Sequence, residues 1–357
     1  MGVPTLGVEE ELLLVDGRTG ALCQDSEHVL ARARELVAEG VEHELRRGMV
    51  ETGSPPVRDL AALRSGVQRG RDAAVQAAAG LGVRVLASST HPDARPEETG
   101  YTDDPRYARI AAVYGPLADQ ALVGGCHVHV GVPSREAGVA VLDRVRPWLA
   151  VLLALSANSP LWRGRDTGYA SWRTQAWSRF PTAGPTSPFG GLDAYEARAD
   201  ALVAAGAAID RGMLYYEARL SERWPTVEVR VADVCAEVGT AVLVAALARG
   251  LVMTALDDAA PPPEVPAELL RAATFAASRH GLSGRLWHPG DRALRPAHEV
   301  VAALVARCRP ALAAAGDDVA VEEEVARLLR DGTGAERQRA AWRSGGLDGV
   351  LGLLARP

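Results

Sequence analysis

The stretch TLGVEEELLLV, residues 5–15, predicts a β-strand that the turn residues Asp16 and Gly17 bring to an end. Side chains two residues apart on a strand point to the same face of a sheet. Glu9 and Glu11 therefore share one face, and both carry a carboxylate that can bind a metal ion. Taken alone, this pair is better explained as the solvated face of a strand, because acidic runs are common on protein surfaces.

Two later stretches repeat this spacing of polar residues. The alternating sequence CHVHVGV carries His127 and His129, and TVEVRV carries Glu228 and Arg230. Each pair also has a structural explanation, because a half-buried strand can hold hydrogen-bonded histidines and Glu228 can form an ion pair with Arg230. The repetition favours a functional role, since separate strands can bring these side chains together on one face of a sheet.

Two further carboxylates, Glu44 and Glu51, come from the short strand-compatible segment 42–51. Mg²⁺ and Mn²⁺ prefer carboxylate oxygens, and one imidazole is acceptable, above all for Mn²⁺. Ions held in this way can bridge the phosphates of ATP and neutralise the charge that develops during phosphoryl transfer. By themselves, Glu44 and Glu51 would count as ordinary surface carboxylates.

All 39 basic residues are arginine, and the chain has no lysine. This excludes a Schiff-base lysine, a pyridoxal phosphate lysine and the lysine of a GxxxxGK phosphate loop. Any nucleotide must therefore be bound by metal ions and arginine. The sequence also lacks the GxSxG and HExxH motifs, so neither a serine nucleophile of that type nor a zinc-protease helix is indicated.

Size and composition indicate a globular protein with a substantial core, because the chain has 357 residues of which 48% are hydrophobic. A net charge of −6 argues against nucleic acid or an anionic membrane as the main partner. The four cysteines form no CxxC pair, which excludes a disulfide framework or a zinc site and fits reducing cytosol. With no signal-peptide pattern, and with Arg249 interrupting the apolar stretch 238–256, we expect a cytoplasmic protein without a membrane span.

We expect an α+β fold formed by a single catalytic domain, residues 1–357, with a helical C-terminal part from 264 onward. Strands are predicted, besides 5–15 and 42–51, at 84–88, 126–132 and 226–231. Helical spacing predicts helices at 26–39, 60–81, 103–115, 116–123, 136–157, 192–208 and 237–256. Residues 158–191, rich in Trp, Arg, Gly, Pro and Ser, are predicted to form a long ordered loop of the kind that serves as a lid or binding loop.

Six segments, in this order along the chain, carry a resemblance to a known family: GVEEELLLVD, HELRRGMVETG, ASSTHP, GGCHVHVGVP, ANSPLWRGRDTGYASWR and TVEVRVAD. They resemble the carboxylate-amine ligases of the glutamate-cysteine ligase type 2 family over about residues 5–256. The same order of motifs is more distantly similar to the glutamine synthetase superfamily. The ordered set is specific, although any one segment is weak.

The resemblance implies a curved, mainly antiparallel sheet, backed by helices, whose concave face binds ATP and metal ions as in glutamine synthetase. It implies Mg²⁺ or Mn²⁺ ligands at six positions: Glu9, Glu11, Glu44, Glu51, His127 and Glu228. Arg230 matches an arginine expected near phosphate, so Glu51 and Arg230 are the implied catalytic residues. His129 is implied to orient its neighbours by hydrogen bonding.

The resemblance also implies a substrate loop with residues that bind substrate or nucleotide beside Arg230: Arg165, Asp166, Tyr169 and Arg173. Salt bridges that pack the loop are an alternative explanation for Arg165 and Asp166. Met49 and Thr52, near Glu51, differ from the residues that many relatives carry, and this difference is expected to affect the substrate pocket.

The implied reaction is ATP-dependent formation of an amide from two small molecules, an acid and an amine. Glutamate is the expected acid, activated as an acyl phosphate, and the amine is left open. Self-association into a homo-oligomer is implied as well, with no subunit number. Two rival functions stay open: a metal-dependent phosphotransferase or ATP hydrolase, and a non-catalytic regulator that binds nucleotide.

Overall fold

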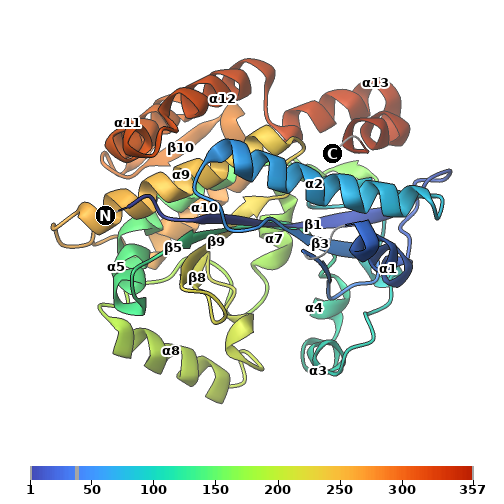
Figure 1. The fold of residues 1–357 in the computed structure, drawn as a ribbon, viewed down its shortest axis with the longest axis horizontal. Helices are drawn as coiled ribbons and strands as arrows, with labels where there is room; N and C mark the ends of the chain where they lie inside the picture. The colour runs from blue at the N-terminus through green and yellow to red at the C-terminus, as the bar shows by residue number, and fades with distance from the viewer. Residues whose placement is uncertain (1, 37–39, 356–357) are drawn as a thin grey trace.

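The computed structural model describes residues 2–36 and 40–355. Its centre is a seven-stranded sheet in which every strand pairing is antiparallel (Figure 1). In spatial order the strands are β2 (Val41–His43), β3 (Met49–Gly53), β1 (Leu6–Asp16), β5 (Gly125–Gly131), β9 (Thr226–Asp233) and β8 (Ala218–Leu220), with β4 (Val83–Leu86) paired to β1. The predicted α+β class with an antiparallel sheet is therefore confirmed.

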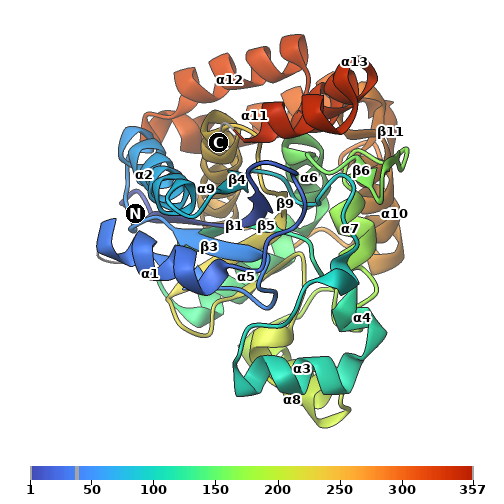
Figure 2. The ribbon, with the colours of Figure 1, turned by 90° about the vertical axis from the view of Figure 1, so that its right-hand side faces the viewer.

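Helices cover both sides of this sheet (Figures 1 and 2). On one side lie α2 (Leu60–Ala79), α9 (Val238–Asp257), α11 (Ala297–Ala315), α12 (Asp318–Asp331) and α13 (Gly334–Leu354). On the other side project α3 (Pro105–Tyr114), α4 (Pro116–Asp119) and α8 (Leu192–Ala204), whereas α5 (Arg135–Val145) packs against α9 and the core-facing side of β8 and β9. The remaining elements are α1 (Ser26–Leu36), α6 (Leu149–Ser156), α7 (Trp172–Trp177), α10 (Ala267–His280) and the hairpins β6 (Leu161–Trp162) with β7 (Arg165–Asp166) and β10 (Arg285–His288) with β11 (Ala293–Pro296).

Two predicted elements are each divided in the structure. The predicted helix 136–157 separates into α5 and α6 at a 3-10 turn, Arg146–Trp148, because Pro147 lacks the N–H that would continue the helix. The predicted strand 42–51 separates into β2 and β3, joined by a turn that carries Glu44. This turn brings Glu44 over the sheet.

Other predictions were incomplete or wrong in part. The C-terminal part from 264 onward is not wholly helical, because it contains the hairpin β10–β11, whose Trp287 packs against α10. The loop 158–191 contains the hairpin β6–β7 and α7, and β8 has no counterpart among the predicted strands. The predicted helix 26–39 is α1 up to Leu36, and residues 37–39 lie outside the described residues.

The sheet buries one of its faces against α9. Val8, Val128 and Val229 point to this side and belong to a hydrophobic cluster that includes most of α9. The same cluster extends into α11 and α12 through Leu304 and Val321. The C-terminal helices α11 and α12 thus share a hydrophobic core with the sheet.

Helix α9 is the central helix of this core. Among the described residues it alone is long and apolar enough to cross a membrane by length and composition, and 83% of its most apolar window is buried by the protein. Its one charged residue within the buried part, Arg249, forms an ion pair with Asp317 beside α12 and donates to the carbonyl of Arg58. These contacts identify α9 as a core helix of this fold.

The middle residue of the acidic run on β1 points away from its two neighbours. Glu10 is 1% exposed and forms two hydrogen bonds with the guanidinium of Arg71 on α2, at 2.7 and 2.6 Å. The same guanidinium donates to the carbonyl of Cys235 at 2.7 Å. A buried ion pair with these added hydrogen bonds fixes the orientation of β1, so that Glu9 and Glu11 must face the opposite side.

Removing one partner of this pair is expected to destabilise the fold strongly. Arg71→Met should lower the free energy of unfolding by about 3–5 kcal/mol, because it leaves the Glu10 carboxylate buried without compensation. Urea denaturation followed by circular dichroism measures this. The exposed Arg64→Met on the same helix should change stability by less than about 0.5 kcal/mol. The double variant Glu10→Met/Arg71→Met should recover part of the loss, and equal losses in the single and double variants would contradict this account.

A second buried carboxyl lies where β8 meets α10. Glu217 is 9% exposed and accepts a hydrogen bond of 2.6 Å from Thr274. Burial raises the pKa of Glu217 to about 7, against the opposing effects of the Thr274 hydrogen bond and the charge of Arg271. Because the folded protein holds this proton more tightly than the unfolded chain, Glu217 makes stability depend on pH.

The sign of this dependence follows from the raised pKa. The stabilisation is complete below the unfolded pKa of about 4.3 and is lost as the pH rises through about 7. Between pH 6 and 8 the protein should lose roughly 1–2 kcal/mol relative to Glu217→Gln, which cannot ionise. Chemical denaturation of both proteins at the two pH values measures the difference. A difference that does not change with pH would show that Glu217 titrates normally.

Candidate functional site

The predicted ligands meet on the face of the sheet opposite α9. The register pairs them across neighbouring strands: Glu11 lies opposite Glu51, Glu9 opposite His127, and His129 opposite Glu228. On each strand, the residues on either side of these ligands point into the core, as the alternating sequence predicted. Four strands, β3, β1, β5 and β9, therefore contribute to one continuous polar surface.

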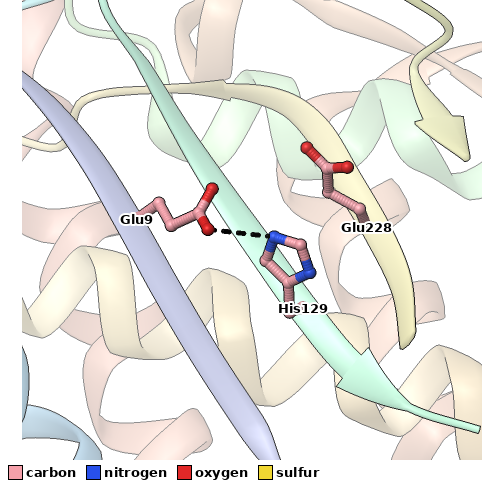
Figure 3. A group of neighbouring side chains, drawn as sticks. All are labelled: Glu9, His129 and Glu228. Carbon is pink, nitrogen blue, oxygen red and sulfur yellow. Dashed lines mark ion pairs between the residues drawn. The ribbon is translucent and has the colours of Figure 1, made fainter. Parts of the chain in front are cut away.

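The first of three potential metal clusters on this surface comprises Glu9, His129 and Glu228, drawn in Figure 3. One potential ligand atom from each lies within 4.8 Å of the others. His129 Nε2 is 3.4 Å from Glu9 Oε1, and His129 Nδ1 is 2.9 Å from the hydroxyl of Thr226. The hydroxyl orients the ring, so His129, predicted only to orient its neighbours, also occupies a position from which it can bind a metal ion.

The other two clusters overlap with the first. They comprise Glu9, Glu51 and His127, and Glu11, Glu44 and Glu51. Glu44 reaches this site from the turn between β2 and β3, where its carboxylate accepts a hydrogen bond of 2.8 Å from the backbone N–H of Leu45.

The carboxyls at the β3 end of the surface repel one another. Burial, together with the charge of Glu44, raises the pKa of Glu11 to about 8. Burial and crowding also raise the pKa of Glu51 well above its usual value, and burial raises that of Glu44. Such crowding needs a positive charge to balance it. The chemistry of this donor set, several carboxylates with imidazoles, fits Mg²⁺ or Mn²⁺.

Near β5, the pKa shifts favour a neutral His127 beside an ionised Glu9. Burial, reinforced by the charge of Arg230, lowers the pKa of His127 to about 4, so the ring is neutral and can act as a ligand at pH 7. Burial alone would raise the pKa of Glu9, but hydrogen bonds to His127 and His129 hold it below its usual value. Glu9 is therefore ionised beside two histidines.

Arginines border the surface at β8 and β9. Glu228 forms ion pairs with Arg230 and with Arg219, the latter at 2.7 Å, and these charges outweigh burial and hold the pKa of Glu228 well below its usual value. The predicted ion pair between Glu228 and Arg230 thus exists within the same surface. A β-bulge sets Arg230 and Val231 opposite the single residue His127, and the Arg230 guanidinium lies 3.5 Å from His127 Nδ1.

The loop after α6 is tied to the end of β9 by one buried carboxylate. Asp233 accepts hydrogen bonds from the N–H of Asn158 and from the hydroxyls of Ser159 and Ser171, at 2.7–2.8 Å. Arg173 follows on α7, where its buried guanidinium donates to the backbone carbonyls of β9 and influences the pKa of Glu11. Arg173 therefore borders the site beside Gly125 and His127, although it is not among the residues that line the cavity.

Three predicted substrate-loop residues are not brought to this surface: Arg165, Asp166 and Tyr169. Arg165 and Asp166 are exposed on β7, and Asp166 pairs with Arg339 of α13 at 2.9 Å. The Tyr169 ring packs against Trp172 and Phe275. The geometry therefore favours the alternative explanation, in which this part of the loop packs against α10 and α13.

A cavity of about 2560 Å³ lies over the polar surface and has room for a nucleotide together with small substrates. Its walls include residues that the sequence analysis missed: Tyr107, Trp177, Tyr215 and Arg219. The aromatic residues carry no spacing signal, since they come from α3, α7 and the segment before β8. Of the two residues that were expected to affect the substrate pocket, Met49 lines the cavity, whereas Thr52 is buried on the other face against Gly70.

The family model described as glutamate-cysteine ligase family 2 (GCS2) matches residues 5–350. The chain belongs to this family. The match continues beyond the quoted segments, which end near residue 256, through the C-terminal helices. Membership places the chain among ATP-dependent carbon-nitrogen ligases, as the sequence predicted.

Relatives and solved structures agree with this family. A Frankia alni protein named "Putative glutamate--cysteine ligase 2-2" is 46% identical over 373 residues, covering 99% of this chain and 97% of that protein. "Putative glutamate--cysteine ligase 2" of Streptomyces coelicolor is 46% identical over 358 residues, covering 99% and 98%. The glutamate–cysteine ligase of Francisella tularensis in complex with AMP has a TM-score of 0.77 at 13% identity, over 100% of this chain and 88% of its own. A bifunctional glutathione synthetase from Pasteurella multocida has a TM-score of 0.71 at 17% identity, over 99% and 52%. At these identities the two structures show a shared fold.

Glu9 and Glu51 each belong to two of the three clusters, and Glu51 is the one that joins a cluster with an imidazole to the cluster made of carboxylates alone. Glu51→Gln should weaken Mn²⁺ binding by at least about 10-fold, since an amide cannot supply the charge of a carboxylate ligand. Isothermal titration calorimetry and the electron paramagnetic resonance of free Mn²⁺ measure this. Glu323→Gln, exposed on α12, is the matched control. Unchanged stoichiometry and affinity in Glu51→Gln would remove Glu51 from the metal site.

Proposed function

We propose that the chain activates a carboxylate of glutamate, or of a similar acid, with ATP and joins it to an amine. The observation that carries this proposal is the convergence of five carboxylates and two imidazoles in three overlapping clusters within one large cavity. A protein without lysine can handle ATP at such a site through cations and arginine. The cytoplasmic location and self-association stay predictions.

Two chemical steps account for the products. The acid carboxylate attacks the γ-phosphorus of ATP, which forms an acyl phosphate and releases ADP. The amine nitrogen then attacks the acyl carbon, and phosphate leaves as the nitrogen loses its proton. Mg²⁺ or Mn²⁺, held by the six predicted ligands, would neutralise the charge on the phosphates.

The protein contributes mainly by position and charge. Arg230 and Arg219 border the clusters, where a fixed positive charge can stabilise a transferring phosphoryl group without any rearrangement. Glu228 holds both guanidiniums in place.

The identity of the amine depends on the wall beside Glu51. Cysteine is the first candidate, because the relatives carry the name of glutamate–cysteine ligase. Met49 contributes a flexible apolar side chain to this wall and is therefore the differing residue that can alter the choice of amine.

The direct test is incubation with ATP, Mg²⁺, glutamate and a panel of amines that begins with cysteine. We expect phosphate release that depends on the amine, together with a new amide detected by mass spectrometry. Glu228→Gln should reduce turnover by at least about 100-fold with the fold intact by circular dichroism, because it loses a charged ligand that also positions two arginines. Glu323→Gln should keep full activity.

The other functions give different results in the same assay. Phosphate release that is insensitive to every amine would indicate a phosphotransferase or ATP hydrolase. ATP binding without turnover would indicate a regulator. Full activity of Glu228→Gln at ordinary Mg²⁺ concentrations would contradict the assignment of the metal site.

A further inference from the structure

One end of the polar surface has no side chains. Gly7 on β1 and Gly53 on β3 occupy positions on the same face as the acidic residues, and both line the cavity. Gly53 lies opposite Glu9, and Gly7 lies opposite His129. Glycine inside a strand forfeits packing and commonly marks a place where a ligand approaches the backbone closely.

Local packing does not explain these two glycines. A Cβ at Gly7 would come no nearer than 3.8 Å to His129 Cβ, and one at Gly53 no nearer than 3.9 Å to the Gly40 carbonyl. Neither residue has a positive φ. Gly131 on β5 differs, because a Cβ there would lie 2.9 Å from the hydroxyl of Thr5. Gly7 and Gly53 therefore form a floor of the cavity with free space above it.

Trp224 is an exposed aromatic residue at the mouth of the cavity that this floor also lines. It lies in the β8–β9 hairpin, lines the cavity and is 51% exposed. Its backbone N–H donates to the hydroxyl of Ser221 at 3.1 Å, and the carbonyl of the next residue, Pro225, accepts from the backbone N–H of Val132 at 3.0 Å, next to Gly131. The hairpin thus holds a large exposed indole in a defined place.

Two further contacts mark this mouth. The Arg223 guanidinium lies over the Trp224 ring at 4.9 Å from its centroid, and Arg223 is 3.9 Å from Glu42 of β2, the strand at the far edge of the sheet. The sheet therefore curves until its two edges approach each other here. His129, the member of the first cluster that lies opposite Gly7, is 9% exposed, and its Nε2 is 3.4 Å from Glu9 Oε1.

We propose that the base of ATP stacks on Trp224, with the ribose over Gly7 and Gly53 and the polyphosphate directed to the cluster of Glu9, His129 and Glu228. This inference rests on the proposed function, since it places the nucleotide of that reaction. A flat base gains dispersion and electrostatic energy on an indole, and an arginine in contact with the same ring supports such stacking. A floor without side chains lets the sugar approach the backbone.

The test compares ATP with inorganic tripolyphosphate, which has the phosphates but no base, by calorimetry of the full chain in Mn²⁺. Trp224→Ala should weaken ATP binding by roughly 5- to 100-fold, the range of base–aromatic stacking, and should leave tripolyphosphate binding unchanged. Trp224→Phe, which keeps a stacking ring, should change ATP affinity by less than about 5-fold. Phe275→Ala, an exposed aromatic residue outside the cavity, is the control.

A second variant tests the floor. Gly7→Val should fold, because the backbone accepts a β-branched residue, and should weaken ATP binding much more than Mn²⁺ binding. Unchanged ATP affinity in Trp224→Ala, or an equal loss for ATP and tripolyphosphate, would overturn the stacking position while leaving the ligase proposal intact. If the unsubstituted protein bound neither ATP nor tripolyphosphate, the proposed function itself would fail, and this inference with it.

Discussion

The ion pair between Glu10 and Arg71 determines which way β1 faces. In a strand, a slip of one residue moves every side chain to the opposite face, so the acidic run by itself is ambiguous about which carboxylates meet the metal ions. Burying one carboxylate against an arginine of α2 removes this ambiguity. Glu9 and Glu11 are then directed to the cavity. Pairing with β1 also determines which side chains of the neighbouring strands point to that face.

The site balances charge in two different ways. At the β9 side, Glu228 is neutralised by arginines that belong to the protein. At the β3 side, Glu11, Glu44 and Glu51 form no ion pair with an arginine within residues 2–36 and 40–355. Burial raises the pKa values of all three, and repulsion between the carboxylates adds to this for Glu11 and Glu51. This asymmetry means that protons or cations must balance one half of the surface, whereas the other half is balanced before any ligand binds.

The sequence predicted the site better than its surroundings. Alternation within single strands was enough to place Glu9 with Glu11, His127 with His129, and Glu228 with Arg230 on one face of each strand, because this depends on local geometry alone. The aromatic wall, by contrast, combines Tyr107 and Tyr215 from distant segments, and only tertiary packing brings them together. Arg165 and Asp166 were assigned to the site by resemblance, yet the loop that carries them packs against α13, a contact with no local signal.

The bulge in β9 explains an odd spacing in the sequence. Glu228 and Arg230 are two residues apart, as one face of a strand requires, but Asp233 lies three residues further on. The extra residue at the bulge opposite His127 brings Asp233 level with Gly125, where it can anchor the loop that contains Ser159 and Ser171. The length of this strand is therefore constrained as strictly as its composition. A single deletion between Arg230 and Asp233 would detach the loop from the site without changing any residue in the site itself.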